Sequence, residues 1–157
     1  MDKRVGYKRQ HNTKLNEFYC FLHNNFSSEL YPSNKAYNFI NELQEPVTLI
    51  GSWKVSLSEY YLEYSSPPAS PVYLLCAICN ESPSRISNYH QNSILRSIIL
   101  PQNDTSSQAI YQTPYYFPIG VSVVERIPIE VVKTDGTYLD TSSTCHVTLH
   151  FRRDEQI

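Results

Sequence analysis

Hydrophobic and polar residues alternate with a period of two along much of this chain, which is the pattern of a half-buried β-strand. Trp53, Val55 and Leu57 fall on one face of their segment, with polar residues between them. Residues 145–152 alternate in the same way, and residues 72–78 are apolar on both faces, as in a strand buried from both sides. These runs predict the following core residues: Trp53, Val55, Leu57, Leu74, Cys76, Val147, Leu149 and Phe151.

Two other runs contain polar residues or proline at informative positions. Tyr37, Phe39 and Leu43 are expected to face inward, with Asn41 among the polar residues between them. Pro128 lies inside a later alternating run. Because proline has no backbone N–H to donate, this run is predicted to be an edge strand or to carry a bulge.

Turn residues separate the predicted strands. Asp135 and Gly136 lie between two β-patterned runs and predict a hairpin turn, because glycine adopts positive φ without strain. No segment has the 3.6-residue period of an amphipathic helix, and about eight strands in such a chain predict an all-β fold, a single antiparallel β-sandwich of the jelly-roll type. Two of the predicted runs are expected to merge into one long, bent strand. The runs are 17–22, 35–43, 46–51, 52–60, 72–79, 94–99, 109–117, 120–132 and 144–152.

The length of 157 residues predicts one domain with enough core to fold without disulfide bonds. We expect a basic, flexible arm at 1–16, the β-sandwich at 17–153 and a short tail at 154–157. No apolar run has the length of a membrane helix, and the N-terminal segment lacks the apolar stretch of a signal peptide. We therefore expect no membrane partner and reduced cysteines.

Charge is concentrated at the N-terminus. Residues 1–14 carry a net +4 and the whole chain −2, which leaves −6 for the remainder. Two interpretations stay open: a solvated terminus, or an arm that contacts an acidic protein surface or nucleic acid. The basic residues of this arm are Lys3, Arg4, Lys8, Arg9 and Lys14.

Few residues of this chain have the type and spacing that a metal site or a catalytic site requires. Cys76 and Cys79 have the spacing of half a zinc site, but no second ligand pair of suitable geometry accompanies them, so we interpret them as core residues and expect no metal or cofactor. His146 and His150 fall on one face of the last predicted strand, where they form either a pH-sensitive patch or an ordinary polar face. Without a nucleophile motif or a glycine-rich phosphate loop, no catalytic residue is assigned and no enzyme is expected.

Tyrosines gather in short clusters. Tyrosine combines a large apolar ring with a hydroxyl that stays hydrated, so such clusters are either ordinary strand aromatics or contacts between subunits. The candidate interface residues are Tyr60, Tyr61, Tyr115 and Tyr116.

Short motifs follow one another in a specific order. They are YPSN at 31–34, PVTL at 46–49, GSWKVSLSE at 51–59, VYLLC at 72–76, SILR at 93–96, YYFPI at 115–119 and VTLHFRR at 147–153. Their order over residues 18–153, and the closing LHFRR above all, resembles the penton-like minor capsid proteins of Polinton/Maverick elements and adintovirus-like viruses. The chain departs from that pattern at Ala77, where the family has Asp, and at 138–140. It is also shortened between the Trp53 and Cys76 strands.

The resemblance implies a structural capsid protein of the penton type, a single jelly roll that assembles as a homopentamer at capsid vertices. Such a protein would contact copies of itself and major capsid protein neighbours. It would be made in the cytoplasm, assemble in the nucleus and reside in the virion. Its basic arm would reach neighbouring subunits or nucleic acid.

Two alternatives belong to other functional classes. One is a host-encoded, domesticated β-sandwich module that binds a protein or glycan without catalysis. The other is a cupin-like jelly-roll enzyme, which would need inward histidines and a carboxylate converging on a metal.

Overall fold

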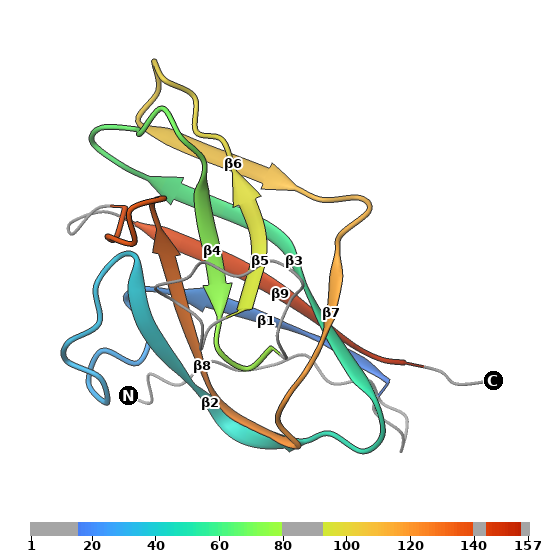
Figure 1. Ribbon diagram of the computed structural model, residues 1–157. Coiled ribbons are helices and arrows are strands. Elements are labelled where there is room, and N and C mark those ends of the chain that lie inside the picture. Colours follow the sequence, from blue (N-terminus) through green and yellow to red (C-terminus); the bar gives the residue numbers. More distant parts are fainter. Residues whose placement is uncertain (1–15, 80–92, 140–143, 155–157) are drawn as a thin grey trace.

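A computed structural model of the chain describes residues 16–79, 93–139 and 144–154, and within these ranges the backbone forms strands and turns but no helix (Figure 1). The sequence-based prediction of an all-β fold is therefore confirmed. The strands are β1 (Glu17–His23), β2 (Asn38–Thr48), β3 (Trp53–Glu63), β4 (Val72–Cys76), β5 (Ser93–Ile98), β6 (Ser106–Ile110), β7 (Tyr116–Pro118), β8 (Val123–Val132) and β9 (Cys145–Arg153).

The strands form two antiparallel sheets that pack face to face. One has the order β1-β9-β3-β6, with β7 also paired to β3, and the other has the order β2-β8-β4-β5. When β6 and β7 are taken as one position beside β3, this interleaved order is that of a single jelly roll. In Figure 1 the strands β4, β5 and β8 cross in front of β1, β3 and β9 at a steep angle.

The core lies between the two sheets and follows the two-residue period. Phe18, Cys20 and Leu22 of β1 point inward, and the Phe18 ring stacks on Phe151 of β9 with centroids 4.6 Å apart. Burying an aliphatic or aromatic side chain of this kind stabilises the fold by roughly 1.5–3 kcal/mol. All eight residues that the alternation assigns to the core lie in this cluster: Trp53, Val55, Leu57, Leu74, Cys76, Val147, Leu149 and Phe151.

Several strand boundaries differ from the predicted ones. The runs 35–43 and 46–51 merge into β2, whose pairing with β8 shifts register between Glu42 and Val47. The run 109–117 divides into β6 and β7, with Pro114 between them. Since proline withholds a backbone donor, it interrupts pairing with β3 at that point. The run 72–79 ends at Cys76.

Pro128 does not lie on an edge strand, so that alternative of the prediction was wrong, although the pairing of β8 with β2 does have a register shift nearby, between the pairs Glu42–Arg126 and Val47–Val124. β8 is an interior strand between β2 and β4. Pro128 opposes Ile40 of β2, whereas the pairing with β4 begins only at Ile129, opposite Cys76. The missing N–H is tolerated because only one neighbouring strand pairs at this position.

The turn at Asp135 and Gly136 forms, but it does not join two strands of one sheet. Gly136 has φ 87°, and the backbone N–H of Lys133 donates to the carbonyl of Thr137 at 2.8 Å. The Asp135 carboxylate accepts hydrogen bonds from Thr137, which lowers its pKa. After the turn, Tyr138 forms an isolated bridge with Val132 of β8 and the Leu139 N–H donates to the Val131 carbonyl at 3.1 Å, whereas β9 lies in the opposite sheet.

Asn41 faces the core, contrary to its predicted place among the outward polar residues. Its side chain is fully buried, with Nδ2 donating to the carbonyls of His23 and Phe26 at 3.0 Å each. Its Oδ1 accepts the His23 N–H at 2.9 Å. The amide thus satisfies backbone groups at the end of β1 and in the following turn, which is why a polar side chain is accommodated there.

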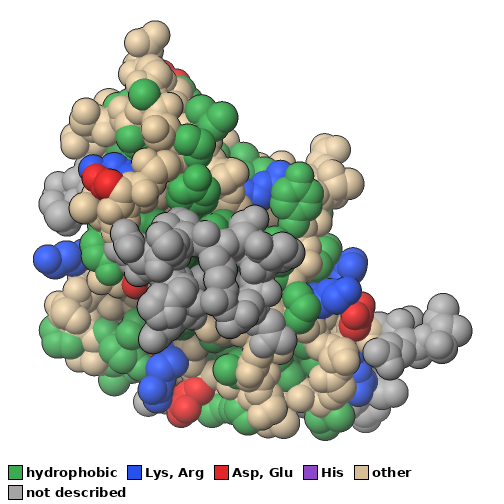
Figure 2. Space-filling model, viewed as in Figure 1, with side chains coloured by type: hydrophobic (Ala, Val, Ile, Leu, Met, Phe, Trp, Pro, Cys, Tyr) green, Lys and Arg blue, Asp and Glu red, His purple; other side chains and the backbone are tan. Residues whose placement is uncertain are grey.

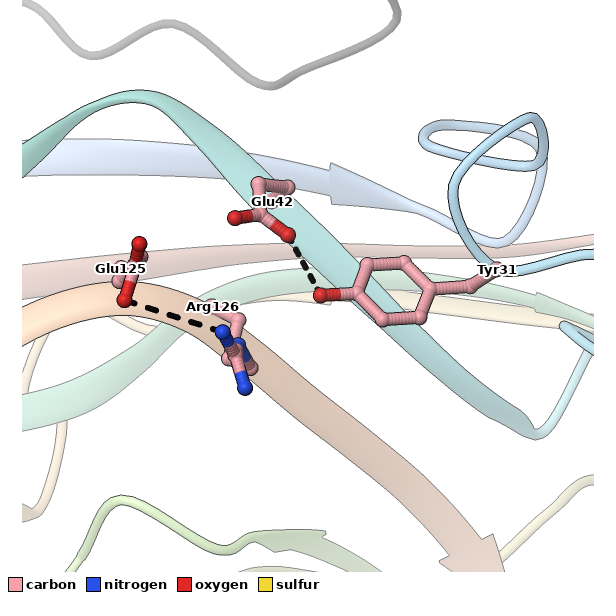
Figure 3. Close-up of polar contacts among 4 residues, drawn as sticks. All are labelled: Tyr31, Glu42, Glu125 and Arg126. Carbon is pink, nitrogen blue, oxygen red and sulfur yellow. Dashed lines mark hydrogen bonds and ion pairs between the residues drawn. The ribbon is translucent and has the colours of Figure 1, made fainter.

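Tyr31 and Glu42 hold the connection before β2 against the sheet. The Tyr31 hydroxyl donates to Glu42 Oε2, and Figure 3 shows the ring reaching across β2 to this carboxylate. Burial, together with the bond to Glu42, raises the pKa of Tyr31. The nearby pair of Glu125 and Arg126, 3.8 Å apart and more than half exposed, contributes little stability because solvent screens it.

Candidate interaction surface

A ladder of aromatic and basic side chains covers the outer face of β1, β9 and β7. The Tyr19 ring stacks on the His150 imidazole with centroids 4.4 Å apart. The Tyr116 hydroxyl and His150 Nδ1 share a hydrogen bond of 2.8 Å, and the Arg152 guanidinium lies 3.6 Å above the Tyr116 ring. These contacts fix three strands to one another on the solvent side of the sheet.

His150 is the most buried member of this ladder. Its side chain comes from an outward-facing position of β9, yet the residue is only 8% exposed. Glu17 Oε2 lies 3.3 Å from its Nε2, although the geometry does not make a hydrogen bond. Burial lowers the pKa of His150 more than the Glu17 carboxylate raises it, so the imidazole is neutral at neutral pH.

Two more histidines extend the ladder toward the other end of β1. His23 and His146 are paired in register across β1 and β9, with ring centroids 6.2 Å apart. Burial, followed by repulsion from His146, lowers the pKa of His23. The sequence placed His146 and His150 on one face of the last strand. It gave no sign of His23, because that neighbour depends on which strand pairs with β9.

Tyr60 packs in the core, whereas its prediction as a subunit contact implied an exposed side chain. It is 7% exposed, and its hydroxyl bonds to Ser107 Oγ at 3.0 Å. The pairing of β3 with β9 shifts register between Leu57 and Glu59. This shift inserts one residue into the alternation, so Tyr60 turns inward and Tyr61 turns outward.

The other three candidate tyrosines keep at least part of their surface, but they do not form one patch. Tyr61 of β3 is paired with His146 of β9. Tyr116 of β7 is paired with Ser56, at a different position along β3. Tyr115 is 60% exposed, and its ring lies 4.0 Å from the Arg96 guanidinium.

Exposed hydrophobic side chains on the sheet edges were missed by the sequence analysis. β1 and β6 are the outermost strands of their sheet. Phe21 on β1 is 45% exposed and Ile110 on β6 is 76% exposed. Edge strands with exposed apolar side chains are typical sites of contact between chains.

The opposite sheet has a mixed surface. Figure 2 shows basic and acidic side chains intermixed on this face, with hydrophobic ones between them. Ile99, which follows β5, is 76% exposed. Its exposure was not evident from the sequence, because the apolar run Ile98–Leu100 continues past the end of β5.

The four cysteines are buried and none of them forms a disulfide bond. Burial raises the pKa of Cys20 to about 12 and raises that of Cys145 as well. For Cys79, a hydrogen bond with Cys76 is the largest cause of its raised pKa. Such thiols are protonated at neutral pH and are poor nucleophiles. Within the described ranges, His, Cys, Asp and Glu side chains form no group of three or more placed to hold a metal.

The basic arm lies outside the described residues, as do Lys3, Arg4, Lys8, Arg9 and Lys14. In the part of the chain that the structure describes, no helix is both long and apolar enough to cross a membrane. No protein-family model and no curated protein matches this sequence.

Proposed function

We propose that this protein is a structural capsid protein of the penton type, related to those of Polinton/Maverick elements and adintovirus-like viruses, and that it assembles as a homopentamer at capsid vertices. The observation that carries the proposal is the interleaved strand order of a single jelly roll, which agrees with the fold implied by the ordered motifs. A subunit of this kind needs a rigid sandwich and exposed contact surfaces rather than a catalytic centre.

The edges of the sandwich support an assembling role. In a closed ring each subunit uses two different surfaces, one for each neighbour. The sheet β1-β9-β3-β6 ends in two different exposed edges, with Phe21 on β1 and Ile110 on β6. Other vertex contacts would involve major capsid protein neighbours, and the basic arm would reach a neighbouring subunit or nucleic acid. The virion is the proposed location, after synthesis in the cytoplasm and assembly in the nucleus.

Light scattering coupled to size-exclusion chromatography tests the proposal. The chain has a mass of 18.2 kDa, and we expect a species of five times that mass that persists on dilution. A protein that remains monomeric over a wide concentration range would contradict the proposal. That result would favour a binding module that acts without assembly.

A further inference from the structure

A pocket of about 500 Å³ opens on the outer face of the sheet between β3, β6 and β9. It lies at the end of β9 that begins with Cys145, far from the start of β1. Its walls combine aromatic, acidic, amide and imidazole groups. The lining residues are Glu59, Tyr60, Tyr61, Gln108, Ala109, Ile110 and His146.

The Glu59 carboxylate on β3 lines this pocket, and the Glu63 carboxylate lies beside it on the same strand. After the register shift in β3, Glu59, Tyr61 and Glu63 occupy alternate positions and share the outward face. Glu59 accepts a hydrogen bond of 2.9 Å from the Thr148 hydroxyl, and Glu63 accepts one of 2.8 Å from the Tyr61 hydroxyl. In the described ranges, hydroxyl groups are the hydrogen-bond partners of both carboxylates, so neither charge is neutralised by a lysine or arginine.

This chemistry fits the side chain of a lysine or arginine. A cation in the pocket would face the Glu59 carboxylate, and Tyr61 would offer an aromatic ring for its aliphatic stem or its charge. The chain itself supplies a matching segment, because residues 1–14 carry a net +4 while the remainder carries −6. The charge complementarity between arm and pocket identifies the occupant.

Strand direction decides which copy supplies the arm. The carbonyl of Asn16, the residue before β1, accepts the N–H of Arg153 at 2.8 Å, so the arm joins the sheet at the C-terminal end of β9. His146 of the pocket lies at the opposite end of the same strand. Because β1 pairs Glu17 with Arg152 and His23 with His146, the start of β1 lies at the end of the sheet opposite the pocket. This placement of the first described residues favours the arm of a neighbouring copy, rather than that of the same copy, as the occupant.

We propose that the pocket between β3, β6 and β9 receives a lysine or arginine side chain from the basic N-terminal arm of a second copy. This inference rests on the proposed function, because it requires that copies of the chain assemble. It assigns the outward carboxylates Glu59 and Glu63 as the acceptor of the arm.

A zero-length cross-linking experiment on the full chain tests this proposal. Unlabelled and heavy-nitrogen-labelled copies are mixed, allowed to exchange and treated with a carbodiimide, which joins a lysine amine to a nearby carboxylate. Mass spectrometry should then find mixed-isotope peptides that link Lys3, Lys8 or Lys14 to Glu59 or Glu63. Links between peptides of one isotope only would mean that each copy binds its own arm, which would overturn the proposal.

Matched variants show whether the links depend on the pocket. The variant Tyr61→Ala keeps both reactive carboxylates but removes the pocket ring that would pack on the lysine stem, so the fold should persist while the mixed-isotope links to Glu59 and Glu63 fall. The control, Glu42→Gln with Glu125→Gln on the opposite sheet, should retain them. Links spread equally over the carboxylates of both sheets would contradict a specific site.

The same samples separate this inference from the proposed function. A pentameric mass without links to the pocket would overturn the arm assignment and leave the capsid proposal standing. A monomeric mass would contradict the capsid proposal itself. An unchanged circular dichroism spectrum of Tyr61→Ala would show that the lost links do not reflect unfolding.

Discussion

Nε2 of His150 lies 3.3 Å from Oε2 of Glu17 across the β1–β9 pair, yet burial still lowers the pKa of this imidazole. The carboxylate is partly exposed and the histidine is not, so the cost of burying a charge on His150 exceeds the attraction that Glu17 provides. The lowered pKa of His150 makes the folded state sensitive to mild acid.

Acidification should destabilise the fold through His150 and His23. Both have a lowered pKa in the folded chain, so the unfolded chain binds protons that the folded chain does not. Stability is therefore complete above the ordinary histidine pKa of about 6.5 and falls as the pH drops below it. Urea unfolding across this range should show a falling free energy of unfolding, with a smaller fall in His150→Gln. Stability that is flat or rises on acidification would contradict the prediction.

Removing the Phe151 ring should cause a large loss of stability. This side chain is fully buried and stacks on Phe18, so Phe151→Ala leaves a cavity in the centre of the sandwich. We expect a loss of about 3–5 kcal/mol in the free energy of unfolding, measured with denaturant. The control Ile99→Ala, which follows β5 in the opposite sheet and is 76% exposed, should change it by no more than about 0.5 kcal/mol. Equal effects of the two variants would be inconsistent with this core.

Replacing the buried Asn41 should destabilise the fold more than replacing an exposed asparagine. Asn41→Ala removes the partners of backbone groups of His23 and Phe26, and each unsatisfied buried group costs about 1–3 kcal/mol. Asn103→Ala, in an exposed turn, serves as the comparison and should be nearly neutral. Thermal unfolding of the two variants measures the difference. A melting temperature of Asn41→Ala that equals that of the unaltered chain would disprove the role given to this amide.

The native thiols should react slowly. All four cysteines are buried, and burial raises the pKa of Cys20 to about 12. A chromogenic thiol reagent should therefore label none of them quickly at neutral pH and all four after denaturation. Fast reaction of a cysteine in the folded protein would show that the sandwich is open near that residue.

Local alternation was sufficient to predict the sandwich and much of its core. Trp53, Val55 and Leu57 alternate with polar residues because a strand with one buried face requires it. Tyr60 could not be placed in this way, because the register shift in β3 reverses the alternation and leaves no mark in the sequence. Asn41 also looked like an outward polar residue, since its backbone partners lie in a distant part of the chain.

The pocket depends even more on the pairing of distant strands. The sequence shows Glu59 and Glu63 beside clustered tyrosines, but not that Gln108 and His146 lie next to them. These neighbours come from β6 and β9, which flank β3 only in the folded sheet. Pairing between strands far apart in the chain is set by the whole topology rather than by local pattern.

Negative-stain electron microscopy of the purified full chain tests the central claim most directly. If the chain is a penton-type jelly roll that adheres to its own copies, class averages should show rings with five-fold symmetry. Dispersed particles of single-chain size, or closed assemblies of another symmetry, would contradict that account.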